Sequence, residues 1–249
     1  MALTTVLSVS VRPERFGSYE TAVQRLAAKA QEDKEPFEWA AHQVTAGALG
    51  TIHFVSEAPD WATLGTREPV DVLIRRVMGD SEGSELIDQI YCCMAAERYI
   101  IGQPRLDLSC PPEGARSFSP MSMVTLIRSR PGGQDACEEL IRKVAQAIPA
   151  VEDPRRFVAY QTVIGDLRRY WVVTPLDDIG LLDRSLQPAE LLQKAFGAEG
   201  ALLYRTGIDA IEHLERQFTA LRPDLSNGAW VSAALARQRA TAQPAEHVH

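Results

Sequence analysis

Two histidines, His42 and His53, are the residues whose type and spacing point most directly to chemistry. They lie in two β-rich runs, residues 37–46 and 51–56, which are separated by the short loop Gly47-Ala48-Leu49-Gly50. This pattern is typical of an antiparallel hairpin. Imidazole exchanges protons near neutral pH and is also a common metal ligand. The pair could therefore act as a general base, hold a metal ion or haem, or pack as two hydrogen-bonded core residues.

The alternation of side chains along a strand places both imidazoles on one face of this hairpin. If Ala46 lies opposite Thr51, His53 lies opposite Val44, and His42 lies opposite Val55. The other face then carries an apolar set with one amide: Trp39, Ala41, Gln43, Ile52 and Phe54. Neither face of the hairpin has the polar composition of a solvent-exposed surface, so we expect other parts of the protein to cover both faces.

Aromatic and amide side chains of the same region are candidate ligand contacts, because pockets for small molecules are mostly apolar with a few polar groups. The candidate ligand-binding residues are Trp39, Gln43, Trp61, Tyr160, Gln161 and Trp171. Aromatic residues of a hairpin can equally be plain core. The two glutamines can equally be structural, each bonding across the seam between two sheets, because buried amides need partners.

The hairpin region recurs later in the chain. Residues 37–64 match residues 155–182 without a gap at seven positions, of which Ala41 with Ala159, Gln43 with Gln161 and Gly47 with Gly165 are examples. Average composition would give about two chance identities over this length, so the match indicates a duplication. Tyr160 and Trp171 occupy the positions of His42 and His53, which predicts at most one working cleft.

The expected elements follow one order in both halves. In the first half we expect a strand at 5–12, a helix at 19–33 capped by Ser18, the hairpin, a helical turn at 59–64, helices at 70–78 and 84–101, and a strand at 105–109. The second half repeats this with a strand at 123–130, a helix capped by Asp135 and Glu138, a hairpin at 157–164 and 169–174, and helices at 187–196 and 200–221. The predicted boundaries are repeat 1 at 1–112, a linker at 113–121, repeat 2 at 122–226, and a tail at 227–249 that is partly helical or disordered.

Each half thus has the order β-α-β-β-α-β of a ferredoxin-like domain, in which helices cover one face of a four-stranded antiparallel sheet. The uncovered face is apolar here, and a second sheet of the same chain could cover it. The predicted fold class is α+β: two tandem ferredoxin-like repeats whose sheets pack together as an intrachain α+β barrel.

Composition excludes several classes of function. The chain has 249 residues and a formal net charge of -7 with interspersed signs, which argues against binding nucleic acid. No apolar run reaches the length of a membrane span and the start lacks a leader pattern, so we expect a soluble, cytoplasmic protein with no membrane partner. The four cysteines, Cys92, Cys93, Cys110 and Cys137, have no metal-binding spacing and are expected to be reduced. We expect no dedicated metal site.

The strand, Pro13, helix and aromatic-bearing hairpin, together with the Asp60-Trp61 turn, resemble the dimeric α+β barrel superfamily, which includes antibiotic-biosynthesis-monooxygenase-like domains. The resemblance implies a barrel that is usually formed by two subunits, here as a single-chain tandem fusion. It also implies a range of activities, from cofactor-independent monooxygenases that form quinones to enzymes that bind or degrade haem. The haem-degrading type uses an Asn, a Trp and a His in one cleft, whereas the only Asn of this chain is Asn227.

Three functional hypotheses follow. The first is a protein that binds a small apolar or aromatic molecule in a cleft between sheet and helices, and that, if it is an enzyme, is a cofactor-independent monooxygenase with His42 or His53 as base. The second is a non-enzymatic binding or structural protein without a working site. The third is haem or metal binding through His42 and His53. In each case the assembly would be a monomer with an internal pseudo-dimer, or a homodimer of it.

Overall fold

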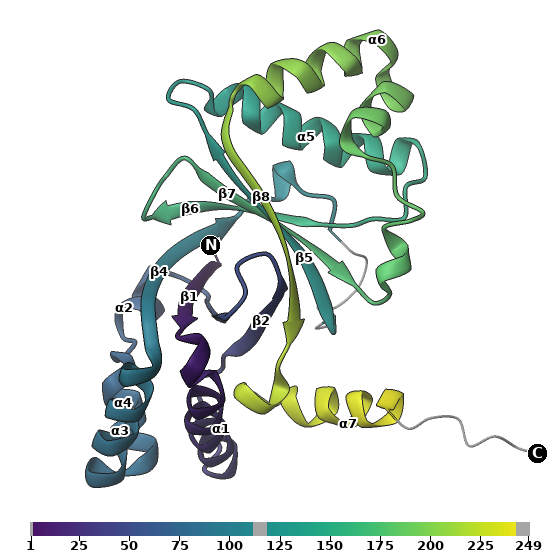
Figure 1. Cartoon of the computed structure of the whole chain (residues 1–249). Helices are drawn as coiled ribbons and strands as arrows, with labels where there is room; N and C mark the ends of the chain where they lie inside the picture. The colour runs from purple at the N-terminus through teal and green to yellow at the C-terminus, as the bar shows by residue number, and fades with distance from the viewer. Residues whose placement is uncertain (1, 112–118, 243–249) are drawn as a thin grey trace, which may run out of the picture. The chain divides into compact units, whose positions relative to one another are not determined.

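The computed structural model of the chain describes residues 2–111 and 119–242. It is a mixed α+β fold in which eight strands form a closed antiparallel barrel in the order β1-β3-β2-β8-β5-β7-β6-β4 (Figure 1). Seven α-helices accompany these strands in the described part of the chain. This confirms the predicted fold class, with the order β-α-β-β-α-β occurring twice.

The chain contains two compact units, which we call the histidine unit and the aromatic unit after the residues discussed below. The histidine unit comprises residues 6–43, 50–99 and 221–249, and the aromatic unit comprises residues 1–5, 44–49 and 100–220. Each unit therefore takes a segment from both halves of the sequence.

The histidine unit is built on a three-helix layer that covers one face of its strands. Its strands include most of β1 (Leu3–Val11), β2 (Ala40–Ala46) and β3 (Thr51–Ala58), and its main helices are α1 (Phe16–Glu32), α3 (Val70–Met78) and α4 (Asp80–Cys93). The short helix α2 (Trp61–Gly65) and the terminal helix α7 (Val231–Ala242) also belong to it. Its core joins residues of α1, α3 and α4 to Ala41, Ile52 and Phe54 of the hairpin.

The aromatic unit has a two-helix layer. Its strands are β5 (Met121–Ser129), β6 (Val158–Ile164), β7 (Arg169–Leu176) and most of β8 (Ile211–Leu221), and its helices are α5 (Gln134–Ala150) and α6 (Pro188–Asp209). Helices α5 and α6 lie side by side (Figure 1). Their buried residues pack on Ala159 and Tyr170 of the second hairpin.

The last strand of each half occupies residues that we predicted to be helical. We expected one helix over 84–101 and another over 200–221, but α4 ends at Cys93 and α6 at Asp209. Strand β4 (Met94–Pro104) and strand β8 follow directly. The predicted strand at 105–109 is instead a 3-10 turn at Leu106–Leu108. Runs such as Met94-Ala95-Ala96-Glu97-Arg98 favour a helix locally, and strand pairing overrides that preference.

Both predicted helix caps were wrong. Helix α1 begins at Phe16 after a 3-10 turn, so Ser18 lies inside it, and α5 begins at Gln134, so Asp135 lies in its first turn. Glu138 bonds to Arg105 instead of capping. Elsewhere the boundaries agree well: α3 spans Val70–Met78 as predicted, and Asp60 caps α2 by accepting a bond from the Thr63 amide at 2.7 Å.

The hairpin register is shifted from the predicted one, although its faces are the predicted ones. His42 lies directly opposite His53, and Ala40 lies opposite Val55. This register centres the turn between Gly47 and Ala48, one residue earlier than we predicted. Gly47 and Gly50 have φ angles of 109° and 79°, which only glycine adopts easily and which allow the chain to turn this tightly.

Candidate functional site

The candidate site is the cross-strand pair of His42 and His53 with the neighbouring Ser8, and we call these three residues the histidine site. They come from β2, β3 and β1 of the histidine unit. The Ser8 hydroxyl lies 2.8 Å from His53 Nδ1, and this hydrogen bond orients the ring. The alternate residues Ala41, Ile52 and Phe54 pack under the helices, so the two histidines lie on the face turned away from the helices.

Burial keeps both imidazoles neutral. It lowers the pKa of His42 to about 4, with His53 as a second cause, and it lowers the pKa of His53 to about 4. A charged imidazolium loses hydration when it is buried, and two of them would also repel each other. Near neutral pH the histidine site is therefore a pair of uncharged groups that can accept a proton or donate one hydrogen bond each.

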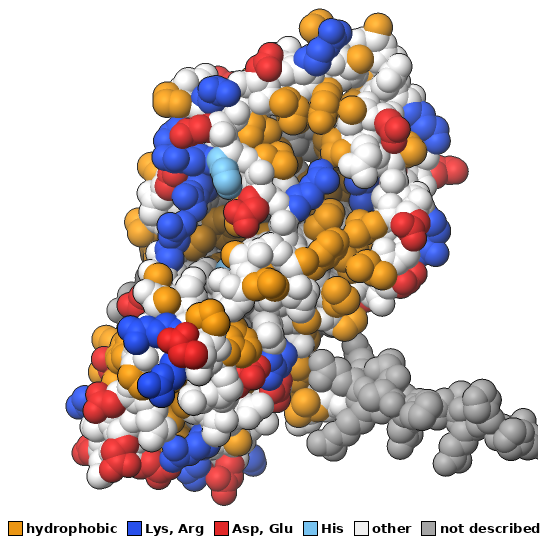
Figure 2. Space-filling model, in the orientation of Figure 1, with side chains coloured by type: hydrophobic (Ala, Val, Ile, Leu, Met, Phe, Trp, Pro, Cys, Tyr) orange, Lys and Arg blue, Asp and Glu red, His pale blue; other side chains and the backbone are white. Residues whose placement is uncertain are grey.

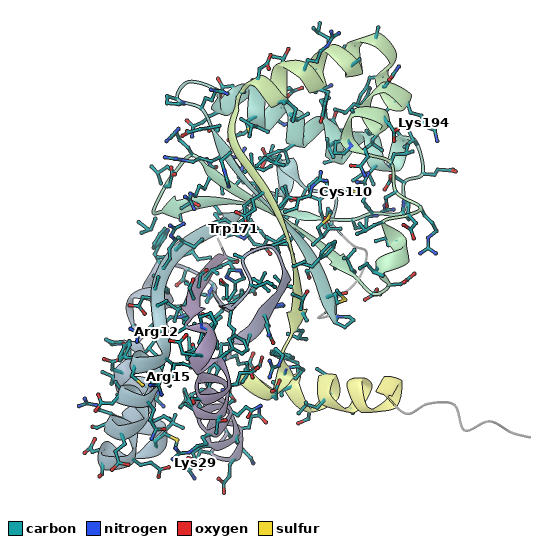
Figure 3. All side chains as sticks on the ribbon, in the orientation of Figure 1. Arg12, Arg15, Lys29, Cys110, Trp171 and Lys194 are labelled. Atoms are coloured by element: carbon teal, nitrogen blue, oxygen red, sulfur yellow. The ribbon has the colours of Figure 1, made fainter. Side chains whose placement is uncertain are left out.

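The equivalent place in the aromatic unit is occupied by aromatic rings. Tyr160 lies directly opposite Trp171, and their rings stack at 5.5 Å between centroids with an angle of 8°. A Cβ at Gly102 would lie 1.9 Å from Cη2 of Trp171, so the indole fills the space above this glycine. Figure 3 shows Trp171 among the strands. Leu126, opposite Trp171 on β5, stands where β1 has Ser8.

The structure does not bring the predicted tryptophans to the histidines. Trp39 is buried on the helix side of its sheet, where its indole N–H donates to the Leu225 carbonyl at 2.8 Å and its ring lies against Phe37. Trp61 begins α2, and nearly half of its surface is exposed. Trp39 therefore lies on the opposite face of the hairpin from His42 and His53.

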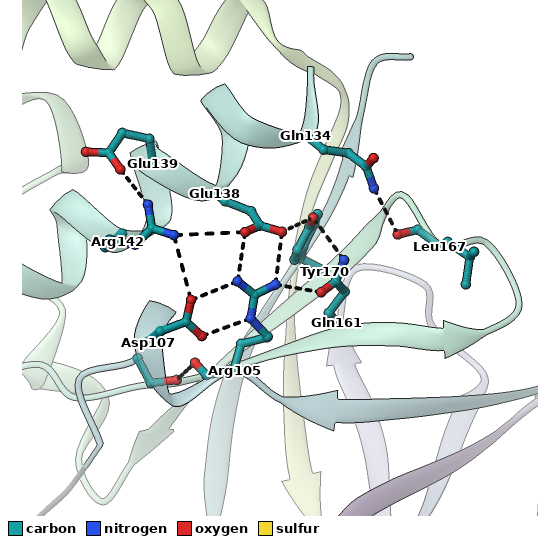
Figure 4. A network of polar contacts seen from close by, with 10 residues as sticks. Arg105, Asp107, Gln134, Glu138, Glu139, Arg142, Gln161, Leu167 and Tyr170 are labelled. Carbon is teal, nitrogen blue, oxygen red and sulfur yellow. Dashed lines mark hydrogen bonds and ion pairs between the residues drawn. The ribbon is translucent and has the colours of Figure 1, made fainter. Parts of the chain in front are cut away.

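The two predicted glutamines belong to arginine networks. Gln161 Oε1 accepts from Arg105 Nη1 at 2.6 Å, and its amide nitrogen donates to the Tyr170 hydroxyl at 3.2 Å (Figure 4). Arg105 also forms a two-pronged ion pair with Glu138 at 2.8 and 2.9 Å. Hydrogen bonds to Asp107 and Glu138 raise the pKa of the Arg105 guanidinium. The hydrogen bond from Arg105 is the largest cause that lowers the pKa of the Glu138 carboxyl. The charges are thus held in fixed pairs.

The histidine unit carries a matching network. Gln43 accepts from Arg222, which also bonds Glu20 and forms a two-pronged pair with Asp224 at 2.7 and 2.9 Å. In both networks the glutamine and the arginine come from different halves of the sequence but lie in the same compact unit. Sequence reasoning missed both arginines, although the repeated triplets Asp107-Leu108-Ser109 and Asp224-Leu225-Ser226 each follow an arginine by two residues.

The donor set of the histidine site does not resemble that of haem degradation or of a structural metal centre. Among the described residues no three His, Cys, Asp or Glu side chains come together as a metal would need. The single asparagine, Asn227, is buried, and its amide donates to the carbonyls of Glu35 and Phe37 at 3.0 and 2.7 Å. The Asn227 amide therefore hydrogen-bonds to backbone carbonyls and takes no part in a cleft with His42.

A hollow of about 400 Å³ lies elsewhere in the histidine unit, between α1 and α4. It is lined by Arg15, Ser18, Thr21, Ala22, Arg25, Gln89, Cys92 and Cys93, and not by either histidine. Sequence reasoning missed it because nothing in the residue spacing reveals that α1 and α4 are neighbours.

The molecule's surface agrees with its composition. Acidic and basic side chains are interspersed over the face seen in Figure 2. Exposed and half-buried arginines form ion pairs with acids, as in the contacts of Arg168 with Glu212 at 2.7 Å and of Arg155 with Asp153 at 2.9 Å. Within the described ranges, no helix combines the length and apolarity needed to cross a membrane.

Comparison with known proteins supports the fold only. No protein-family model and no curated protein sequence matches the chain. An anthrone oxidase-like protein is similar in structure, with a TM-score of 0.57, 13% identity, and coverage of 89% of this chain and 91% of that one. A candidate monooxygenase from Lactobacillus acidophilus NCFM has a TM-score of 0.52 and 8% identity, with coverage of 91% of this chain and 95% of that one. The chlorite dismutase of Candidatus Nitrospira defluvii, in complex with imidazole, has a TM-score of 0.51 and 10% identity, with coverage of 95% of this chain and 94% of that one. The chain therefore has the same α+β barrel fold as these structures.

Proposed function

We propose that the protein binds a small, flat, mostly apolar molecule against the histidine site and oxidises it with O2, without a metal or organic cofactor. The observation that carries this proposal is the pair of neutral imidazoles, half-buried on adjacent strands, with Ser8 orienting one of them. Perturbed titratable groups of this kind are concentrated at functional sites.

The difference between the two units supports a single working site. At equivalent rungs of the two hairpins, one unit has Ser8, His42 and His53 and the other has Leu126, Tyr160 and Trp171. A stacked aromatic pair packs favourably in a protein core, whereas burying imidazoles costs desolvation free energy. Retention of the costly arrangement in one unit only is what a functional site would require.

The surroundings of the imidazoles suit a flat ligand. The next rung on the same face of the hairpin is the buried Ala40 opposite the half-buried Val55, so apolar side chains adjoin the two polar groups. Small-molecule sites commonly combine apolar walls with a few polar groups that fix orientation.

The chemistry proposed is proton removal followed by direct reaction with O2. An anthrone, chosen because of the anthrone oxidase-like structural neighbour, loses an acidic proton to an imidazole and becomes an electron-rich anion. That anion reduces O2, and one oxygen atom enters the ring as the new carbonyl while the other leaves as water, so anthrone and O2 give anthraquinone and H2O. The negative charge of the bound anion would stabilise the imidazolium and raise its low pKa.

The test is O2 uptake and quinone absorbance with anthrone as substrate, using the purified full chain and the His42→Ala and His53→Ala variants. We expect quinone formation above the spontaneous rate, reduced at least tenfold by either substitution, as is typical for loss of a general base. Binding of anthrone without turnover would favour the non-enzymatic alternative. A Soret band or bound metal that disappears in His42→Ala would favour the haem or metal alternative and overturn the proposal.

We also propose that the two halves, divided near residues 113–121, arose by tandem duplication. The support is that both hairpins share one register at an offset of 118 residues, since His42 pairs with His53 as Tyr160 pairs with Trp171. A protein expressed as residues 1–112 alone should then associate with one expressed as residues 119–249, and failure to do so would count against two related halves.

A further inference from the structure

The hollow between α1 and α4 contains a pair of adjacent thiols. Cys92 is exposed and Cys93 is buried, and both line the hollow, where their sulfur atoms lie 3.9 Å apart. They are the last two residues of α4. A volume of about 400 Å³ is within the range of small-molecule sites.

The rest of the lining is polar and positively charged. Arg15, Arg25, Ser18, Thr21 and Gln89 surround the thiols. Arg25 forms an ion pair with Glu82 at 2.7 Å, whereas Arg15 is exposed and has no acidic partner among the described residues within ion-pairing distance. Figure 3 shows Arg12 and Arg15 where β1 runs into α1. An anionic group entering the hollow would find Arg15 available.

The two thiols differ in the way that a thiol-exchange pair requires. The pKa of Cys93 is raised by burial and by Cys92, so it remains a thiol. Cys92 is the accessible one, and its thiol donates to the Gln89 carbonyl at 3.2 Å. Attack on an incoming reagent therefore falls to Cys92.

A disulfide between the two cysteines would be strained. Consecutive Cα atoms are about 3.8 Å apart, whereas disulfides usually join Cα atoms that are about 4.4 to 6.8 Å apart, and such deviations make the bond easier to reduce. The pair is thus poorly suited to a structural disulfide and well suited to a bond that forms and reopens.

We propose that Cys92 is a site of reversible S-thiolation by a small, carboxylate-bearing thiol, which Arg15 holds in the hollow and Cys93 releases. The Cys92 thiolate attacks a disulfide RSSR, which forms Cys92–S–SR and expels RS⁻, and RS⁻ takes up the proton that Cys92 lost. The Cys93 sulfur then attacks the sulfur of Cys92 and its proton passes to the departing RS⁻, which leaves as the second RSH, and a Cys92–Cys93 disulfide remains. Reduction of that disulfide by two further thiols restores the starting state.

The experiment treats the full chain with oxidised glutathione and follows its intact mass and peptide map. The wild type should gain the mass of one glutathione at Cys92 and then lose it as the Cys92–Cys93 disulfide forms. In Cys93→Ser the adduct should persist, because the releasing thiol is gone. In Cys92→Ser no adduct should form in this peptide. Addition at Cys110 or Cys137 with Cys92 unmodified would overturn the proposal.

The role of Arg15 is tested by comparing two disulfides. Arg15→Gln should slow the reaction of Cys92 with the anionic glutathione disulfide about tenfold, as expected for loss of electrostatic attraction. It should slow the reaction of Cys92 with the neutral 2-hydroxyethyl disulfide far less. The matched control is Arg184→Gln, which removes another exposed arginine and should change neither rate. Equal slowing of both disulfides by Arg15→Gln would show that Arg15 acts on the thiolate alone and would refute recognition of a carboxylate.

Discussion

His42 lies directly opposite His53 across β2 and β3. Because burial lowers the pKa of both rings to about 4, two groups that are usually part-charged near neutral pH are here both neutral. The same rung of the second hairpin is a stacked tyrosine and tryptophan. One barrel thus presents, at equivalent positions, a histidine pair in one unit and an aromatic pair in the other.

The free energy of unfolding should depend on pH through this pair. Between about pH 6.5 and pH 4 the unfolded chain protonates His42 and His53 while the folded chain does not. The unfolded state then binds more protons, so stability falls as the pH falls, by at most about 3 kcal/mol for each histidine. Urea unfolding from pH 7 to pH 4.5 measures this loss.

A variant with both histidines replaced, His42→Tyr and His53→Trp, supplies the control for that measurement. It copies the aromatic pair of the other unit and retains the exposed His213 and every carboxylate. Its stability should vary much less over the same range of pH. An identical slope in wild type and variant would mean that other groups control the acid response.

The arginine networks should be major contributors to stability. Removing the Arg105 side chain takes the two-pronged ion pair from Glu138 and a donor from Gln161 in a half-buried setting. Arg105→Ala should therefore lower the free energy of unfolding by about 3 kcal/mol, and Arg222→Ala should have a similar effect in the histidine unit. Chemical denaturation measures both values.

The control for the network variants is Arg184→Ala, because Arg184 and Asp178 form an ion pair of which each side chain is 64% exposed. Such pairs contribute less than about 1 kcal/mol. If Arg105→Ala were as mild as Arg184→Ala, the network would be incidental to the fold.

Gly102 should tolerate no side chain, because its Cβ would lie 1.9 Å from the Trp171 ring. Gly102→Ala should displace the indole, change the near-UV circular dichroism, and destabilise the protein by about 1 to 3 kcal/mol. Gly17→Ala is the matched control: Gly17 lies in α1 with nothing within 4 Å of its Cβ position, so the substitution should stabilise by up to about 1 kcal/mol. If Gly102→Ala changed neither the near-UV circular dichroism nor the stability, the close packing of Gly102 against Trp171 would be contradicted.

Much of the fold could be predicted because local patterns and tertiary structure agree there. The hairpins, α3 and the helical turn near residues 59–64 follow from alternation, turn glycines and helical periodicity. Strands β4 and β8 were missed because sequences such as Ala95-Ala96-Glu97 favour helix, and only their neighbours in the barrel make them strands. Propensity cannot reveal a partner that lies far along the chain.

The candidate site was only partly predictable for the same reason. Period-two alternation placed His42 and His53 on one face, and this prediction is confirmed. Ser8 joins them through contact between β1 and β3, and Arg105 reaches Gln161 from 56 residues away. No spacing rule encodes such contacts. The roles of the predicted site residues in binding and catalysis stay predictions.

Binding of a flat aromatic ligand to wild type and to the His42→Tyr/His53→Trp variant tests the central proposal most directly. Isothermal titration with dihydroxyanthraquinone at pH 7 should give one site per chain in the wild type. The dissociation constant should rise at least tenfold in the variant, as expected for the loss of one or two hydrogen bonds, and should be unchanged in Tyr160→Phe. Equal affinity in wild type and variant, or no binding to either, would contradict a ligand site at His42 and His53.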